Sequence, residues 1–317
     1  DVLRRFVTDG EWSTPVFSAA DVEGPGFVGL ANINGQIALL DSPNGFDVVA
    51  GEPTDFPFGY FTNNMKTTSA GYHVVGKLGF FNDAVFTSDD GIAWERFEIE
   101  RPFTATALQI DHFHRTATTA ALSGSLGWAD DLSRTELVAM WWDSSGTSHL
   151  VPARPCENTV IACTITSLAA TSDGLLAAHG FGGQSAVSRW TLERGWSTTL
   201  NLNLPNSRLT STDIDEIVVL AQDDLLFSAN GGITWVALVS SPSQTAGRFI
   251  GVHEPTGTAV FESDSELWLA AAGRWIRFAK GELEIGNVLA VTDGVALFSG
   301  SLPTGPVVIR LVAPDAS

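Results

Sequence analysis

The chain has 317 residues, of which 44% are hydrophobic, and this is enough to bury a large core in a single domain over 1–317. Its 36 acidic residues outnumber 17 basic ones, for a formal net charge of −19. Nucleic acid and anionic membrane surfaces are poor candidate partners, because their phosphates require a basic protein face. No apolar run is long enough for a membrane helix, so we expect no direct membrane insertion.

The first recurring element along the chain is a turn rich in Ser, Asp or Asn and Gly that ends in tryptophan. Its clearest copies are 88–94 (SDDGIAW) and 228–235 (SANGGITW). Weaker copies end at Trp12, Trp196 and Trp275, and degenerate copies lie at 42–46 and 143–147. A spacing of about 40 residues between the last three anchoring tryptophans is typical of a propeller blade built from four short strands.

A second pattern lies ahead of these turns and consists of an apolar run, a Gly or Asp break, and another apolar run. Residues 167–178 and 287–298 are two examples. Two strands joined by a tight turn have this pattern. Each unit is therefore predicted to contain strands A and B, a loop, strand C, the Asp-type turn and strand D.

The repeats predict an all-β fold, a seven-bladed β-propeller, with a six-bladed ring as the alternative. The last unit supplies strands near 287–292, 295–300 and 306–312. We expect its missing strand D at 11–14, so that an N-terminal strand completes the C-terminal blade and closes the ring. Residues 3–8 compete for the strand C position.

The turns resemble the Asp-box, or BNR repeat, of β-propellers, which has the form Ser-x-Asp-x-Gly-x-Thr-Trp. The copy at 228–235 has Asn for Asp, and the copy at 88–94 is one residue shorter. The polar side chains are expected to bond nearby backbone, Gly to adopt positive φ, and Trp to pack between blades. The predicted structural residues are Ser88, Asp90, Gly91, Trp94, Ser228, Asn230, Gly232 and Trp235.

The resemblance implies that ligands bind on the face formed by the D–A and B–C loops, opposite the Asp-box turns. The unusual loops on that face are 51–64, 77–83, 123–136 and 153–164. Their aromatic and charged side chains suit recognition of a protein or glycan, or else they pack on one another. The candidate binding residues are Phe58, Tyr60, Phe80, Phe81, Trp128, Asp130, Asp131, Arg134, Arg154 and His179.

Two further clusters carry chemistry. Cys156 and Cys163 flank a loop and are predicted to form a disulfide, with a reduced pair as the alternative. A disulfide implies export, to the extracellular space or the cell envelope, after removal of a leader. Asp111, His112 and His114 form a weak metal candidate, because alternate residues of a strand share a face. We place the histidines at an A–B turn on the Asp-box face, and we expect no metal and no cofactor.

Sialidases are the best-known enzymes with Asp-boxes, but the resemblance does not extend to their catalytic motifs. Their Phe/Tyr-Arg-Ile-Pro motif is absent, since Arg101-Pro102 and Arg154-Pro155 lack the Ile. Paired carboxylates of a different glycoside hydrolase or a lyase stay open. We expect a monomeric, non-catalytic binder of a protein or glycan. The alternatives are such a hydrolase or lyase, and a structural or assembly factor.

Overall fold

The computed structural model describes residues 16–19, 27–33, 36–42, 49–57, 61–68, 70–77, 83–100, 107–127, 135–152, 164–181, 184–202, 208–220, 224–240, 242, 247–253, 257–272, 274–303 and 305–313. Within these residues all regular secondary structure is β-strand, so the all-β prediction is confirmed. A search of the same residues for helices able to cross a membrane finds none.

The strands in the described residues form seven antiparallel sheets, each made of consecutive strands. The first three sheets contain β1 (Val16–Ala19), β2 (Phe27–Ile33), β3 (Gln36–Ser42) and β4 (Val49–Pro53); β5 (Phe61–Thr68), β6 (Gly71–Lys77), β7 (Asp83–Ser88) and β8 (Glu95–Phe97); and β9 (Ala107–Arg115), β10 (Ala120–Gly127), β11 (Thr135–Trp142) and β12 (Ser148–Val151). The fourth and fifth contain β13 (Thr164–Thr171), β14 (Gly174–Phe181), β15 (Gln184–Thr191) and β16 (Gly195–Leu202); and β17 (Arg208–Asp213), β18 (Glu216–Leu220), β19 (Asp224–Ser228) and β20 (Val236–Ser240). The sixth and seventh contain β21 (Gly247–His253), β22 (Thr258–Ser263), β23 (Glu266–Ala271) and β24 (Arg274–Ala279); and β25 (Glu284–Thr292), β26 (Val295–Leu302) and β27 (Gly305–Val312).

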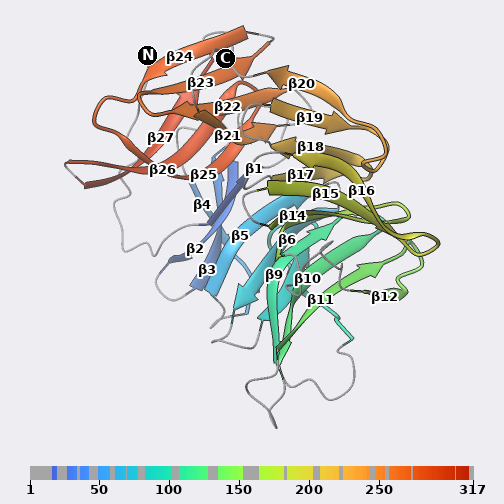
Figure 1. The fold of residues 1–317 in the computed structure, drawn as a ribbon. Coiled ribbons are helices and arrows are strands. Elements are labelled where there is room, and N and C mark those ends of the chain that lie inside the picture. Colours follow the sequence, from blue (N-terminus) through green and yellow to red (C-terminus); the bar gives the residue numbers. More distant parts are fainter. Residues whose placement is uncertain are drawn as a thin grey trace.

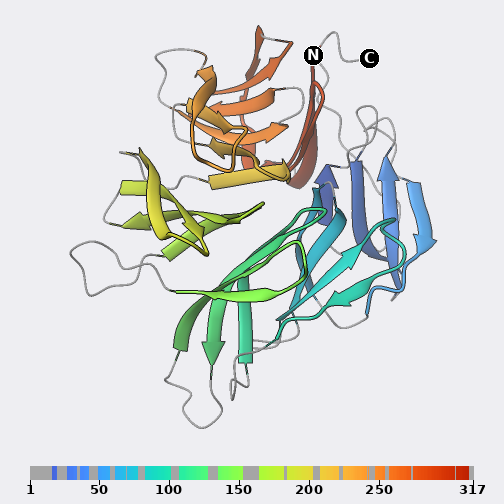
Figure 2. The ribbon, with the colours of Figure 1, turned by 90° about the vertical axis from the view of Figure 1, so that its right-hand side faces the viewer.

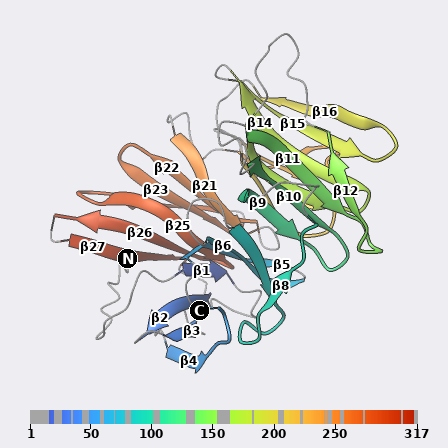
Figure 3. The same cartoon turned by 90° about the horizontal axis from the view of Figure 1, so that it is seen from below.

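The sheets follow one another in chain order around a common centre (Figure 1, Figure 2). We call the first strand of each sheet its innermost strand. Neighbouring innermost strands pack together: β9 contacts β13, β13 contacts β17, and β21 contacts β25. Strand β1 contacts both β5 and β25, so the first and last sheets meet (Figure 3). The segments 3–8 and 11–14, predicted to complete the three-stranded last sheet, lie outside the described residues.

The core lies between successive sheets rather than inside any one of them. Val85 of the second sheet, for example, clusters with Leu108, Leu122 and Met140 of the third. Because the inner strands are covered on both faces, they read as continuous apolar runs, as Leu175 to Ala178 of β14 do. Burying one such Leu or Val side chain contributes about 1.5–3 kcal/mol.

The turn between β7 and β8 is held by its own side chains. The Gly91 N–H donates to Ser88 Oγ at 2.8 Å, and the Ala93 N–H donates to Asp90 Oδ1 at 2.9 Å. These backbone hydrogen bonds lower the pKa of Asp90. The buried Trp94 closes the turn, because its Nε1–H donates to the Gly91 carbonyl at 2.8 Å.

The turn between β19 and β20 repeats the polar part of this arrangement. The Gly232 N–H donates to Ser228 Oγ at 2.8 Å, and the Thr234 N–H donates to Asn230 Oδ1 at 2.9 Å. Asn therefore makes the hydrogen bond that Asp makes in the other copy. Trp235 differs from Trp94, because it is half-buried and its Nε1 has no hydrogen-bond partner among the described residues.

Candidate functional site

From the second sheet onward, the connections from the second strand to the third and from the fourth strand to the next sheet leave the same edge of the antiparallel sheets. We call this the loop edge. Its long connections, 78–82, 128–134 and 152–163, belong to the second, third and fourth sheets. The connections from the second strand to the third are short in the later sheets, as at 221–223 and 264–265. The loop edge is therefore most elaborate around sheets two to four.

Most of the predicted binding residues fall in these connections. Those that lie outside the described residues are Phe58, Tyr60, Phe80, Phe81, Trp128, Asp130, Asp131, Arg134 and Arg154, together with Cys156 and Cys163. The structure describes the strands that these segments connect.

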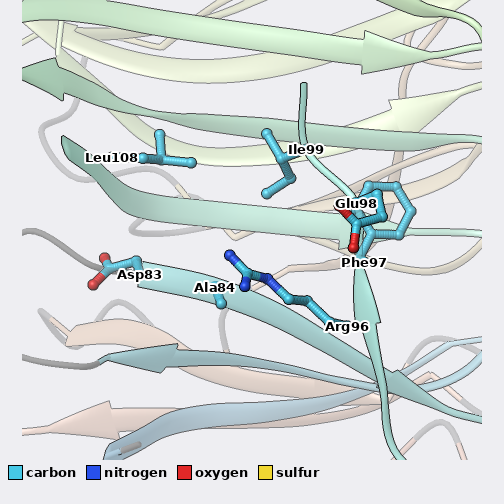
Figure 4. Close-up of a pocket in the computed structure, with 7 residues that line it drawn as sticks. All are labelled: Asp83, Ala84, Arg96, Phe97, Glu98, Ile99 and Leu108. Carbon is cyan, nitrogen blue, oxygen red and sulfur yellow. The ribbon is translucent and has the colours of Figure 1, made fainter. Parts of the chain in front are cut away.

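A recess opens at the loop edge between the second and third sheets (Figure 4). Its lining residues are Asp83, Ala84, Arg96, Phe97, Glu98, Ile99 and Leu108. The segment 78–82 ends directly before it, and 101–106 begins just after it. Its volume of about 30 Å³ holds one or two water molecules. The recess is therefore a dimple in a surface rather than an enclosing pocket.

Asp83 lines the recess, and its carboxylate already has partners. Its side chain is almost fully buried, and Oδ2 accepts the Ile110 N–H at 2.8 Å from the neighbouring sheet. Lys77 Nζ lies 3.6 Å from the same oxygen. A buried carboxylate with a cation and an amide on it ties two sheets together, and nothing in this arrangement readies it for proton transfer.

The rim of the recess carries both charges around an aromatic ring. Arg96 and Glu98 are exposed, and Figure 4 shows the Arg96 guanidinium extending toward the end of β7 that carries Asp83 and Ala84. Phe97, between them, is half-buried. Its ring makes edge-to-face contacts with Phe113 at 5.2 Å and Trp142 at 5.2 Å. The sequence analysis missed these residues, although alternation from Glu95 to Glu100 marks them as a strand with a charged face.

His179 was predicted at the start of a loop but belongs to a sheet. It lies within β14, is 7% exposed, and its Nε2 is 2.9 Å from Ser188 Oγ on β15. The strand extends to Phe181, two residues beyond it. The ring is buried because small Ala and Ser neighbours leave it room inside the sheet.

The placement of His112 and His114 at a turn is wrong. Both lie inside β9, and the turn that follows is 116–119. The His112 Nε2–H donates to the Ile165 carbonyl at 3.3 Å, and His114 Nδ1 accepts the Ala170 N–H at 3.1 Å. The backbone of β13 therefore holds both rings. In the part of the chain that the structure describes, no three His, Cys, Asp or Glu side chains lie close enough to hold a metal ion.

The connection at 51–64 was predicted on the face opposite the Asp-box turns, but residues 54–57, its described part after β4, pack on such a turn. Phe56 is buried with its ring 5.4 Å from Trp94 and 4.9 Å from Phe86. Thr54 donates its N–H to the Ile37 carbonyl at 2.8 Å. Phe56 therefore belongs to the core, while Phe58 and Tyr60 lie outside the described residues and stay predictions.

No protein-family profile matches the chain, and no curated protein matches it. A solved structure described as YCF48 bound to D1 peptide aligns with a TM-score of 0.52 at 12% identity, over 100% of this chain and 96% of that one. Porphyromonas gingivalis dipeptidyl peptidase 4 aligns with a TM-score of 0.50 at 10% identity, over 94% of this chain and 48% of its own. A Mycobacterium tuberculosis puromycin-hydrolyzing peptidase gives 0.51 at 10% identity, over 97% and 52%.

The chain thus spans about half the length of the two peptidases and nearly the whole of YCF48. Identities this low show the fold alone. Together with the consecutive four-stranded antiparallel sheets, these similarities show that the chain has a β-propeller fold.

Proposed function

We propose that this protein is a single-domain, non-catalytic β-propeller that binds a partner protein through the loop edge of sheets two to four. The observation that carries the proposal is the recess between sheets two and three, where Arg96, Phe97 and Glu98 stand between two long connections. Arg and aromatic residues are enriched where proteins bind each other. A glycan is the alternative ligand.

The size of the recess favours a protein surface over a small ligand. Pockets for small molecules measure about 300–1,000 Å³ and enclose most of the ligand, whereas this recess has about 30 Å³. A shallow mixed surface suits a segment of another protein laid across it. The likeness to the YCF48 structure, which contains the D1 peptide, agrees with a peptide or protein ligand.

We further propose seven blades, closed by residues 11–14 as the fourth strand of the last sheet. Seven sheets, a last sheet of three strands, and contact of β1 with β25 support this closure. The hydrogen bonds of the two tryptophan turns support membership of the Asp-box superfamily. We also propose a monomer, exported with Cys156 bonded to Cys163, which an intact-mass measurement under non-reducing conditions tests through the loss of two hydrogens.

The test of the function is selection of binders from a displayed random-peptide library on the immobilised protein, beside a glycan array. Enriched peptides should bind the wild type and lose affinity roughly tenfold on Arg96→Glu, because a reversed charge at an interface repels its former partner. The matched control is Arg194→Glu, an exposed arginine at the turn before β16. Trp128→Ala should also weaken binding while leaving the melting temperature nearly unchanged.

Two results would overturn the proposal. One is equal binding by Arg96→Glu, Trp128→Ala and the control. The other is hydrolysis of a sugar on the array, which would favour the alternative that the protein is a glycoside hydrolase. If a glycan binds without being hydrolysed, and Arg96→Glu and Trp128→Ala lose that binding, the proposed surface is correct and its ligand is a glycan instead of a protein.

A further inference from the structure

Three basic side chains from three different sheets come together on the innermost strands. Lys66 lies on β5, His112 on β9 and Arg208 on β17. Lys66 and Arg208 are exposed, and His112 is half-buried. The charges of both Lys66 and Arg208 act on the His112 ring, so the three groups share one electrostatic neighbourhood.

The backbone explains why residues so far apart in sequence meet. Strand β17 contacts β5 as well as its neighbour β13, although these strands belong to the fifth and second sheets (Figure 1). The Leu209 N–H, next to Arg208, donates to Ser167 Oγ of β13 at 2.6 Å. Two residues earlier on β13, the Ile165 carbonyl accepts the His112 Nε2–H. Strands β9, β13, β17 and β5 are therefore linked by successive contacts between innermost strands.

Within the described part of the chain, no carboxylate pairs with either of the two cations, Lys66 and Arg208. Elsewhere in the described residues cations pair with carboxylates, as Arg277 does with Glu266 at 2.6 Å and Lys280 with Glu262 at 2.8 Å. Neither Lys66 nor Arg208 has an ion pair among those residues. Desolvation by the surrounding protein lowers the pKa of Lys66, although part of its side chain is exposed.

The only acidic side chain that acts on His112 from the described residues is Asp111, on the same strand. Two cations and one carboxylate leave a local charge of about +1 around a neutral imidazole. That is unusual in a chain of net charge −19. A local charge of about +1 matches a singly charged carboxylate better than a doubly charged phosphate.

We propose that Lys66, His112 and Arg208 form a binding site for a carboxylate at the centre of the molecule. Arg208 would grip both carboxylate oxygens with its planar fork, and Lys66 would supply a point charge. Because the His112 Nε2–H is used by the Ile165 carbonyl, Nδ1 is the atom available to accept a proton and then donate to the ligand. The site lies on the innermost strands, so it goes beyond the loop edge and does not depend on it.

The chemistry links binding to proton uptake. Burial lowers the pKa of His112, and the charges of Lys66 and, less strongly, Arg208 lower it further. A bound carboxylate would oppose both charges and raise that pKa. A group that gains a proton on binding makes the affinity rise as the pH falls. Carboxylate binding should therefore be several-fold tighter at a pH near 5.5 than near 7.5.

The test follows the His112 Cε1–H resonance by NMR, assigned with His112→Gln, during titration with four probes. N-acetylglutamate amide carries a side-chain carboxylate, N-acetylglycylglycine a chain-terminal one, and acetate a free acid. N-acetylglutamine amide is the uncharged control. At least one carboxylate should give a saturable shift and an upward movement of the His112 pKa, and the strongest of the three probes identifies the source.

Lys66→Gln and Arg208→Gln should each weaken that binding about tenfold, as loss of a charge-assisted contact does. Because both side chains are exposed, the melting temperatures of the two variants should match that of the wild type. Arg194→Gln is the control and should bind normally, as should Arg96→Glu if the two sites are separate. Inorganic phosphate is titrated in the same way. Wild-type affinity in Lys66→Gln and Arg208→Gln, no response beyond the uncharged probe, or tighter binding of phosphate through the same residues would overturn the proposal.

Discussion

The backbone N–H of Trp94 donates to Asp55 Oδ1 at 2.6 Å, joining the second sheet to the segment that follows the first. The Asp55 N–H in turn donates to the Ile92 carbonyl at 3.1 Å. Phe56, the next residue, lies edge-on to the Trp94 ring. The turn is thus held by its own side chains and also by a neighbouring sheet, which fixes how the first two sheets pack.

Removing this carboxylate should loosen that junction. Asp55→Ala leaves the Trp94 N–H without its acceptor, and we expect a loss of about 1–3 kcal/mol in the free energy of unfolding. Urea denaturation measures the loss. Asp89→Ala is the matched control, because Asp89 is an exposed aspartate of the same turn and should change stability by less than about 0.5 kcal/mol. Equal effects would show that the Asp55 bond contributes nothing.

The two anchoring tryptophans should respond differently to loss of the indole N–H. Trp94→Phe removes the hydrogen bond to the Gly91 carbonyl at 2.8 Å. Trp235→Phe removes a buried donor that has no partner among the described residues, so part of the lost packing is offset. Trp94→Phe should therefore cost about 1–3 kcal/mol more than Trp235→Phe in the same denaturation experiment. A larger cost at Trp235 would contradict the difference between the turns.

The glycine in the turn between β19 and β20 has a steric role in addition to its backbone conformation. Gly232 has φ +80°, and a Cβ there would lie 2.5 Å from Leu176 Cδ1 of the preceding sheet. Gly195, with φ +67°, has nothing within 4 Å of such a Cβ. Gly195→Ala should cost about 1–2 kcal/mol for the left-handed backbone alone. Gly232→Ala should cost about 1–3 kcal/mol more, because it also overpacks the core. Thermal unfolding of the two variants side by side measures the difference.

The sequence predicted those features of the fold that are local. The tight turn at 172–173 sits between β13 and β14 as the apolar pattern indicated, and β26 and β27 lie within two residues of the predicted strands. Gly91 and Gly232 both have the predicted positive φ. Each of these depends on a few consecutive residues, and so the pattern along the chain is sufficient.

What the sequence could not predict depends on partners far along the chain. The acceptor that buries His112 in a strand is Ile165, and the donor that holds His114 is Ala170. Without knowledge of such a partner, a polar residue between apolar runs is predicted to lie in a turn. For the same reason the joint effect of Lys66 and Arg208 on His112 has no signal in the sequence, because it requires the approach of β5 and β17. Phe80, Trp128 and the other loop residues stay predictions.

The buried histidine His73 should make the protein lose stability in mild acid. It is 2% exposed, its ring lies 5.3 Å from Phe113, and neither ring nitrogen has a hydrogen-bond partner in the described residues. Burial lowers its pKa well below 6.5, the charges of Lys66, His114 and Arg115 lower it further, and the Phe113 backbone opposes this with a smaller effect. The neutral ring is therefore the form that the fold accommodates.

The direction of this pH dependence follows from the number of protons that the folded and unfolded states bind. Below a pH of about 6.5 the unfolded chain protonates His73 while the folded chain does not, so the unfolded state binds more protons. Stability is then fully present above that pH and falls by up to about 1.4 kcal/mol per unit as the pH decreases toward the folded pKa. His73→Phe keeps the ring contact with Phe113 and removes the titration. Urea denaturation between pH 7.5 and pH 5 should show the wild type losing stability faster than the variant, whereas parallel curves would mean that His73 takes up its proton without unfolding.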